Sequence, residues 1–420
     1  MKTTVALLVF AAIVALGAGV AYLEGLRAER PPAPPPGSAI SFPWGSMHVD
    51  EDQDEVESDL EKALAQSFTD ERSGEFDEDK DGVREYAVLV LSGGGSAGAF
   101  GAGFLSGWSE SGERPKFKIV TGVSTGSLQA TFAFLGPDYD EALTHVFTQY
   151  GTENIYTERS ILGALLGDSA WDSKPLSDLI ALYITPEVLD AVAERHARGY
   201  RLFVGTSNMD TGEFIIWDMG AIASSNRPDR LERYRQVLLA SCSLPVLFPP
   251  VYFPTEIDGE QYWEMHIDGG AQAQLFLRGF MLDFEDTLKK AIPERQTEIS
   301  MYIIRNGTYD KEANREIIGA SSLSIATATI NGVFELSTEA SLFRTYMLTR
   351  RYGIGFNMAA IPDDMFPELN PVVFDRSVMQ ALYDYAFEAA RNGYDWLNVP
   401  PGLDPDEWIG INAAGETATD

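Results

Sequence analysis

The stretch FKIVTGVSTGSLQATF, residues 117–132, passes from an apolar β-branched run, through two glycines that bracket Ser124, into a helix-like run. The apolar run predicts a strand that is buried on both faces. G-x-S-x-G at a strand-to-helix junction is typical of a nucleophile elbow, in which Gly122 and Gly126 relieve crowding around an exposed serine hydroxyl. A solvated turn is the alternative, because glycine and serine also populate ordinary turns. Catalytic partners for Ser124 elsewhere in the chain would favour the elbow.

Strands alternate with helices on both sides of this stretch. We expect strands at 86–91, 117–121, 201–206, 213–217, 261–267 and 298–305. We expect helices near 56–67, 99–108, 128–135, 138–150, 175–183, 186–198, 228–240, 282–291, 322–350 and 376–396. This alternation predicts one α/β domain with a mostly parallel sheet between layers of helices.

Charge and cysteine content restrict the partners of the chain. The formal net charge of −32 over 420 residues argues against nucleic-acid binding, because phosphates would be repelled. Fifteen acidic and three basic residues lie between Asp50 and Asp81, so much of the acidity precedes the predicted domain. Cys242 is the only cysteine, which excludes an intrachain disulfide and a cysteine-based metal site.

The amino-terminal residues 3–23 are uncharged and apolar, and they are long enough to span a bilayer as one helix. They also fit a secretory signal, with Gly19-Val20-Ala21 as a cleavage site. We therefore expect residues 1–25 to anchor the protein in a membrane, or to export it to the periplasmic or extracellular side. A proline-rich and acidic linker is expected at 26–83, the catalytic domain at 84–400 and a C-terminal tail at 401–420.

The acidic segment contains part of a calcium-binding pattern. Asp77, Asp79 and Asp81 alternate before Gly82, as in the first half of an EF-hand loop. The twelfth position is Val88, where that loop needs a bidentate glutamate. A solvated acidic loop is therefore our expectation, and we predict no metal ion.

The sequence SGGGSAG at 92–98 directly follows the first predicted buried strand. Gly93, Gly94 and Gly95 allow a tight turn whose N–H groups converge near a helix N-terminus, an arrangement that stabilises negative charge. Gly93, Gly95 and Gly98 also satisfy the dinucleotide-binding fingerprint, but the second strand ends without the acidic residue that this fold requires. We expect an oxyanion hole and no cofactor, with a purely structural turn as the alternative.

A nucleophilic serine needs a base, and two candidates lie close together in MHIDGG. Of the four histidines, His266 is the one that suits a Ser–His–Asp triad, with Asp210 or Asp258 to orient it. Asp268 follows two positions later, on the same face of the predicted strand. It precedes Gly269 and Gly270 at the edge where parallel sheets bind ligands, although an Asx turn would also explain it.

Taken together, G-G-G-x-x-G, G-x-S-x-G and D-G-G resemble the patatin-like phospholipases, in particular a bacterial branch of that family. The resemblance covers about residues 86–305 and implies a three-layer α/β/α sandwich with a central, mostly parallel sheet. It also implies a Ser–Asp dyad, with Ser124 as nucleophile, Asp268 as base and the Gly94–Gly95 segment as the source of oxyanion N–H groups. The chain departs from the family at Ala97, where an arginine or lysine is usual, which weakens any expectation of charge-assisted head-group recognition.

The resemblance implies hydrolysis of a phospholipid, lysophospholipid or other acyl ester through an acyl-enzyme. The alternatives are a catalytically inactive, membrane-tethered lipid-binding module and a Ser–His–Asp esterase that uses His266. Burial in an apolar cleft should raise the pKa of Asp268. The proline-rich apolar run at 243–253 predicts either a rigid cleft wall or packed core.

Overall fold

The computed structural model describes residues 29–37, 44–47, 59–72, 74–76, 81–276, 297–308, 319–363, 365–366 and 369–403. The predicted segment at 3–23, Asp77 and Asp79 of the calcium pattern, the helix at 282–291 and most of the C-terminal tail lie outside these residues. Among the helices that are described, none is both long and apolar enough to cross a bilayer.

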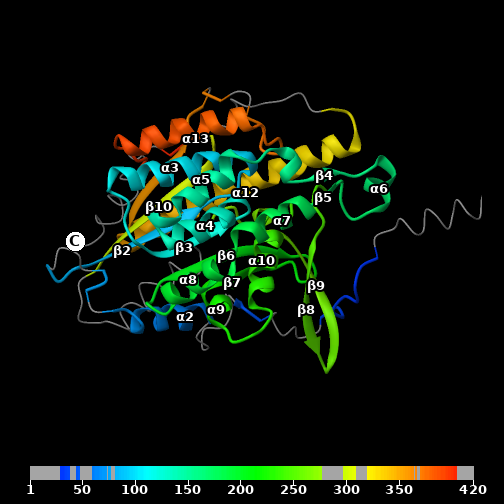
Figure 1. Cartoon of the computed structure of the whole chain (residues 1–420), viewed down its shortest axis with the longest axis horizontal. Coiled ribbons are helices and arrows are strands. Elements are labelled where there is room, and N and C mark those ends of the chain that lie inside the picture. Colours follow the sequence, from blue (N-terminus) through cyan, green and yellow to red (C-terminus); the bar gives the residue numbers. More distant parts are fainter. Residues whose placement is uncertain are drawn as a thin grey trace, which may run out of the picture.

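The centre of the molecule is a twisted sheet to which nine strands of the described chain belong (Figure 1). Five neighbouring strands are parallel: β6 (Arg201–Asn208), β3 (Phe117–Val123), β2 (Arg84–Leu91), β10 (Thr297–Thr308) and β11 (Gly355–Ile361). Antiparallel strands extend the sheet beyond β6: β7 (Phe214–Asp218), β1 (Ser46–Met47), β9 (Glu260–Asp268) and β8 (Val251–Ile257). The predicted mostly parallel sheet is confirmed at its centre, and the antiparallel edge is an addition to it.

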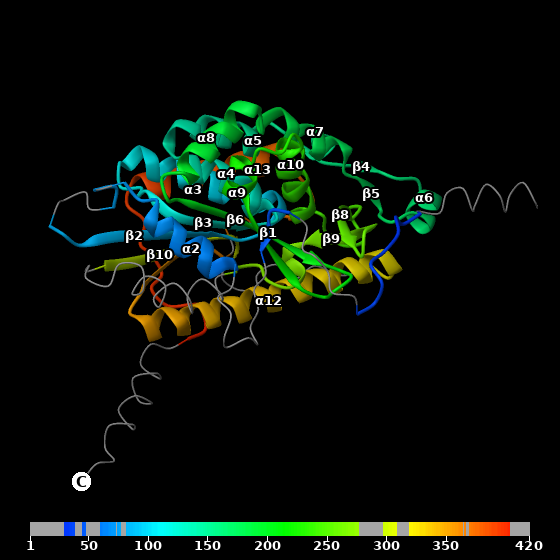
Figure 2. The ribbon, with the colours of Figure 1, turned by 90° about the horizontal axis from the view of Figure 1, so that it is seen from below.

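Helices cover both faces of this sheet, which gives the expected three-layer α/β/α sandwich (Figure 2). One layer contains α3 (Gly98–Ser111), α4 (Thr125–Leu135), α5 (Asp140–Thr148), α7 (Lys174–Tyr183), α8 (Pro186–His196), α10 (Arg230–Ser241) and α13 (Arg376–Arg391). The other face carries α2 (Asp59–Thr69) and the long α12 (Ser322–Tyr352). Shorter elements are α9 (Met219–Ser224), the 3-10 turns η1 (Gly95–Ala97), η2 (Pro137–Tyr139), η3 (Thr152–Asn154) and η4 (Gly269–Ala271), and β4 (Thr157–Glu158), α6 (Ile161–Leu166) and β5 (Trp171–Asp172).

Helix α2 lies within the range predicted as linker, yet it packs onto the sheet. Its Leu60, Leu64 and Phe68 are buried in the same core as the central strands. Glu71, just beyond the helix, is also buried and forms an ion pair with Lys118 of β3. Part of the acidic leader is therefore attached to the domain, while the domain boundaries themselves stay predictions.

Two features of the sheet differ from what the sequence indicated. Strand β11 pairs in parallel with β10 but was not predicted, because GFNMAAI contains few β-branched or aromatic residues. Asp268 was expected at the end of a parallel strand, whereas β9 runs antiparallel to β6 and sets Asp268 opposite Thr206. Because β9 runs antiparallel to β6, the chain approaches Asp268 in the direction opposite to that of the central parallel strands.

Candidate active site

Ser124 occupies a strained turn between β3 and α4. Its φ of 54° and ψ of −131° lie where non-glycine residues are rare, as at a nucleophile elbow. The Ser124 N–H donates to Ser241 Oγ at 2.9 Å, and Ser241 Oγ in turn donates to the Gly205 carbonyl at 2.8 Å. A Cβ on Gly126 would lie 2.3 Å from the Leu91 carbonyl oxygen, so only glycine allows α4 to start this close to β2. These contacts fix the turn that the sequence predicted.

Asp268 is fully buried where β9 ends, and it faces the Ser124 turn. Its Oδ1 accepts a hydrogen bond from the Gly270 N–H at 2.7 Å, which holds the carboxylate over the D-G-G turn. Desolvation raises the pKa of Asp268 to about 7, while the Ser124 hydroxyl and the Gly270 N–H partly offset this rise. This direction agrees with the expectation from sequence. The group thus titrates in the range that a general base needs at neutral pH.

The contact between Ser124 and Asp268 is close but not a regular hydrogen bond. The Ser124 hydroxyl lies near enough to lower the pKa of Asp268, whereas Asp268 Oδ2 has no hydrogen bond of ordinary geometry to any described residue. Catalytic hydrogen bonds are often long or poorly aligned before substrate binds. The two predicted dyad residues are therefore close to each other, and Asp268 Oδ2 has no regular hydrogen bond to the part of the chain that the structure describes.

His266 is oriented away from this arrangement by its own partners. Its Nδ1 lies 2.9 Å from Thr206 Oγ1 and its Nε2 lies 3.3 Å from Glu264 Oε2. The ring packs against Trp217 and Phe253, and burial lowers its pKa. Asp210, proposed to orient the histidine, pairs instead with Arg30. Both ring nitrogens of His266 are thus engaged by Thr206 and Glu264, which favours Asp268 over His266 as partner of Ser124.

The run Gly93–Gly95, which we call the glycine loop, follows the end of β2 and lies beside the Ser124 turn. Gly95 has a φ of 57°, and a Cβ there would lie 1.9 Å from the Pro371 carbonyl oxygen. The N–H groups of Gly94 and Gly95 donate no hydrogen bond to any residue that the structure describes. Ala97, the position where the family usually has a cation, is buried at the start of α3. The loop therefore presents backbone donors, and no side-chain charge, next to Ser124.

The sequence did not reveal the residues that hold the glycine loop in place. Asn306 of β10 donates from Nδ2 to the Ser92 carbonyl at 2.8 Å, and its N–H donates to Ser92 Oγ at 2.9 Å. Asn306 Oδ1 also accepts from the Gly101 N–H of α3 at 3.1 Å. An asparagine at the end of a distant strand has no local sequence signal, so only its position beside Ser92 identifies it.

Gln274 is a second residue that sequence reasoning missed. Its side chain is 6% exposed and makes no hydrogen bond within the described chain. A Cβ on Gly93 would lie 2.4 Å from Gln274 Oε1 and 3.1 Å from Ser124 Cβ, and one on Gly270 would lie 2.3 Å from Gln274 Nε2. The amide therefore fills the space between the glycine loop and the D-G-G turn, next to both dyad residues.

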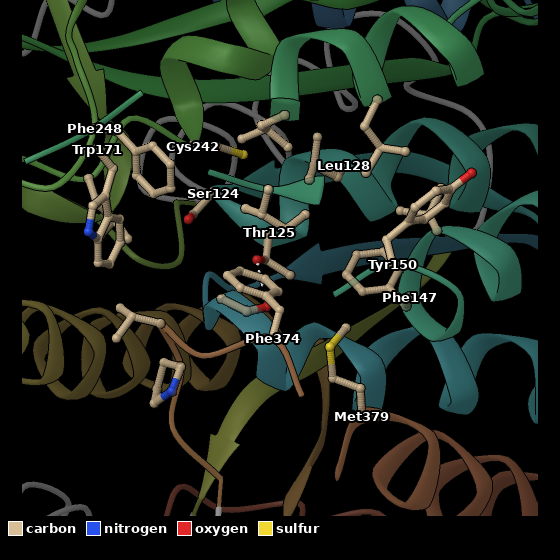
Figure 3. A pocket seen from close by; sticks show the side chains of 18 residues that line it. Ser124, Thr125, Leu128, Phe147, Tyr150, Trp171, Cys242, Phe248, Phe374 and Met379 are labelled. Atoms are coloured by element: carbon tan, nitrogen blue, oxygen red, sulfur yellow. Dashed lines mark hydrogen bonds between the residues drawn. The ribbon is translucent and has the colours of Figure 1, made fainter. Parts of the chain in front are cut away.

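An apolar cavity that is partly open to solvent leads to Ser124 (Figure 3). Its polar wall includes Ser124, Thr125 and Gly95, and its other walls are mainly aromatic and aliphatic side chains from α4, α5, α7, β5 and the segments at 244–248 and 371–374. Phe248 is both buried and part of this wall, so the run at 243–253 is at once core and cleft wall. The cavity suits an acyl chain whose carbonyl lies at Ser124.

Comparison with known proteins agrees with the resemblance drawn from the motifs. Residues 89–281 match the family model described as patatin-like phospholipase, a range that contains Ser124, Asp268 and the glycine loop. No curated protein matches the sequence. Among solved structures, VipD from Legionella pneumophila matches with 13% identity over 74% of this chain and 68% of that chain, with a TM-score of 0.31. That structural likeness is too weak to carry an argument, and the family assignment depends on the family model.

Proposed function

On the premise that residues 89–281 form a patatin-like phospholipase domain, we propose that this protein is a serine lipid acyl hydrolase that works through a Ser124–Asp268 dyad. The observation that carries the proposal is the buried Asp268 carboxylate, which lies close enough to the Ser124 hydroxyl for the hydroxyl to lower its pKa, while Ser124 lines the apolar cavity. A carboxylate without a cationic partner, kept at a pKa of about 7 by burial, is suited to accept the serine proton.

The first half of the reaction forms an acyl-enzyme. Asp268 Oδ2 accepts the Ser124 hydroxyl proton as Ser124 Oγ bonds to the ester carbonyl carbon, which gives a tetrahedral oxyanion. The N–H groups of Gly94 and Gly95, with that of Thr125 at the start of α4, are the donors available for this oxyanion. When the intermediate collapses, the bond to the alcohol oxygen breaks and Asp268 returns its proton to that alcohol.

The second half releases the fatty acid. Water loses a proton to Asp268 while its oxygen bonds to the acyl carbonyl carbon, and the same backbone donors stabilise the second oxyanion. Ser124 leaves with the proton from Asp268, and the carboxylic acid dissociates. The apolar cavity supports acyl chains over polar acyl groups, while the head group has no charged partner in the glycine loop.

A covalent probe and an ester series test this proposal. The full chain should hydrolyse p-nitrophenyl acyl esters and should be labelled at Ser124 by a fluorophosphonate, located by mass spectrometry of peptides. Ser124→Ala should lose both properties, whereas Ser177→Ala, a serine of α7, should keep both. Turnover that survives Ser124→Ala would reject the dyad. A well-folded chain without turnover or label on ester and phospholipid panels would instead favour the inactive lipid-binding module.

We also propose that the apolar segment at 3–23 carries the domain to, or across, a membrane. Its length and lack of charge support this role. Amino-terminal sequencing of the mature protein, together with membrane fractionation, separates the two outcomes. An intact terminus in the membrane fraction indicates an anchor, a cleaved terminus indicates a signal, and an intact terminus in the soluble fraction contradicts both.

A further inference from the structure

A small projection that contains α6 lies at one end of the molecule (Figures 1 and 2). Its two legs are β4 and β5, which pair with each other, and α6 lies between them. Ile161 is 83% exposed and Leu162 is 38% exposed. No charged residue occurs from Ser160 to Gly167, although the whole chain has a net charge of −32. Exposed apolar side chains that are neighbours can form part of an interaction surface.

A third exposed apolar residue lies against the base of this projection. Val246 is 41% exposed and has a φ of 70°, a strained conformation for a β-branched residue. Its carbonyl accepts the Ala170 N–H at 2.8 Å, and the Ala170 carbonyl accepts the Arg159 N–H at 3.0 Å. These two hydrogen bonds link Val246, through Ala170 next to β5, to Arg159 next to β4. Arg159 is two residues before Ile161. We call Ile161, Leu162 and Val246 the apolar rim.

The apolar rim is next in the chain to residues that line the cavity leading to Ser124. Trp171, which belongs to the β5 leg, lines this cavity together with Phe248 (Figure 3). The two rings contact each other edge-on with their centres 5.4 Å apart. The Trp171 N–H donates to the Leu247 carbonyl at 2.8 Å, one residue after Val246. Val246 of the rim is therefore two residues before Phe248, which lines the cavity together with Ser124.

The first described residues of the chain lie on the same side as the rim. Arg30 pairs with Asp210, and the Pro32 carbonyl accepts the Trp263 N–H at 2.9 Å. Arg30 and Asp168, the latter at the end of the projection, both lie near enough to Tyr252 to influence its pKa, which Arg30 lowers and Asp168 raises. Both views also draw residues 30–37 close to α6. The apolar segment at 3–23 ends seven residues before Arg30, a distance of at most about 25 Å in extended chain. A membrane that holds this segment is within reach of the rim.

We propose that the apolar rim inserts into the surface of a zwitterionic lipid bilayer and delivers acyl chains to the cavity. An anionic bilayer is disfavoured, because it would repel a chain of net charge −32. The purpose of this docking depends on the proposed hydrolase function, but the insertion itself does not. Because the rim is uncharged, its insertion should be insensitive to salt, as expected for apolar rather than electrostatic membrane contact.

A depth measurement on the full chain in phosphatidylcholine vesicles tests the insertion. Ile161→Cys carries an environment-sensitive fluorophore, and Leu336→Cys, at a 63% exposed site on α12, is the matched control. The native Cys242 is buried and its thiol pKa is raised, so the unsubstituted chain is the labelling blank. We expect quenching by spin-labelled lipid at position 161 and not at position 336, at low and high salt alike. Equal quenching at both positions, or none at position 161, would overturn the proposal.

Kinetics separate failure of the docking from failure of the proposed function. The double variant Ile161→Asp/Leu162→Asp should raise the KM for vesicle lipid about tenfold and leave hydrolysis of a soluble short-chain p-nitrophenyl ester unchanged. The control Val333→Asp/Leu336→Asp should change neither. An unchanged KM for vesicle lipid contradicts the docking while the hydrolase stands. Quenching at position 161 without any ester hydrolysis by the unsubstituted chain would leave the docking in place and reject the hydrolase.

Discussion

The two ends of strand β3 each have a buried acidic side chain nearby, and the two acids have opposite surroundings. Near its amino-terminal end, Glu71 Oε1 accepts from Lys118 Nζ at 2.6 Å, and Glu71 Oε2 contacts Arg84 and the Tyr86 hydroxyl. Beyond its carboxyl end, Asp268 has no cationic partner within the described chain, and no described residue forms a regular hydrogen bond with its Oδ2. Both carboxyl groups are buried, so burial alone does not mark a catalytic residue.

The difference lies in how completely the polar groups are paired. Lys118 also donates to the Ser67 carbonyl and lies near the rings of Phe68 and Phe76, and burial lowers its pKa well below the ordinary value. That end of the sheet attaches helix α2. At the other end, Asp268 Oδ2 and the N–H groups of Gly94 and Gly95 have no regular hydrogen bond among the described residues. Unpaired polar groups are costly in a core and useful where a substrate will supply the partner.

The largest expected effect comes from the dyad itself. Ser124→Ala and Asp268→Ala should each lower kcat/KM for acyl esters by at least about 10³-fold, because each removes a group that the reaction uses directly. The double variant should be little worse than either single variant, since the two residues act as a unit. Steady-state ester kinetics with active-site titration measure this effect. Independent, multiplicative losses would contradict a shared proton transfer.

Substitution of Glu71, at the end of the sheet where the charges are paired, should lower the stability of the fold rather than the rate of turnover. Glu71→Gln leaves Lys118 and Arg84 buried without their counter-charge, so we expect a loss of about 3–5 kcal/mol in the free energy of unfolding. Asp178→Asn breaks the exposed pair with Lys174 and should cost less than about 1 kcal/mol. Urea unfolding followed by tryptophan fluorescence compares the two. Similar losses in the two variants would show that the buried ion pairs of Glu71 contribute no more to stability than an exposed pair.

The unpaired carboxylate should give turnover its pH dependence. Asp268 acts as a base only when ionised, so with a pKa of about 7 the rate should fall about fiftyfold from pH 7 to pH 5. A kcat/KM profile measured with an ester that does not ionise in this range checks the midpoint. A limb with its midpoint near pH 4 would mean that desolvation of Asp268 is slight.

The same pKa predicts the direction of a stability change. Because the folded pKa is raised above the unfolded value, the folded state binds the proton more tightly, and stability is lost as pH rises from about 4 through 7. Asp268→Asn removes this loss, so its melting temperature should exceed that of the wild type by more at pH 8 than at pH 4. Asp178→Asn, on an exposed side chain, is the control and should show no such trend.

The smallest effect is expected at Gln274. Gln274→Ala empties the space between Gly93 and Gly270 and should lower kcat about tenfold, with little change in KM for a short ester. Gln274→Asn keeps an amide and should recover part of the rate. Pre-steady-state burst kinetics show whether acylation or deacylation is slowed. An unchanged kcat in Gln274→Ala would assign this side chain to packing alone.

Much of this arrangement follows from short stretches of sequence. The apolar run at 117–123, the glycines around Ser124 and the glycine run after β2 each depend on neighbours within a few residues. Period and turn chemistry are local, and they predicted the strand-to-helix junctions, the parallel centre of the sheet and Ser124 as a candidate nucleophile, whereas the choice of Asp268 over His266 as its base came from the family resemblance. Strand β11 and the short β4–α6–β5 projection lack strong local patterns, and they were missed.

The sequence by itself determined which residues can carry the chemistry and in which kind of fold they occur. Only the tertiary structure decided that β9 returns antiparallel to bring Asp268 to Ser124, that Asn306 holds the glycine loop, and that residues 371–374 close the cavity. It also decided that Asp268 has no cation beside it among the described residues, while Glu71 pairs with Lys118 and Arg84. Both carboxylates have the same chemistry, and their pairing depends on which distant groups the fold brings beside them.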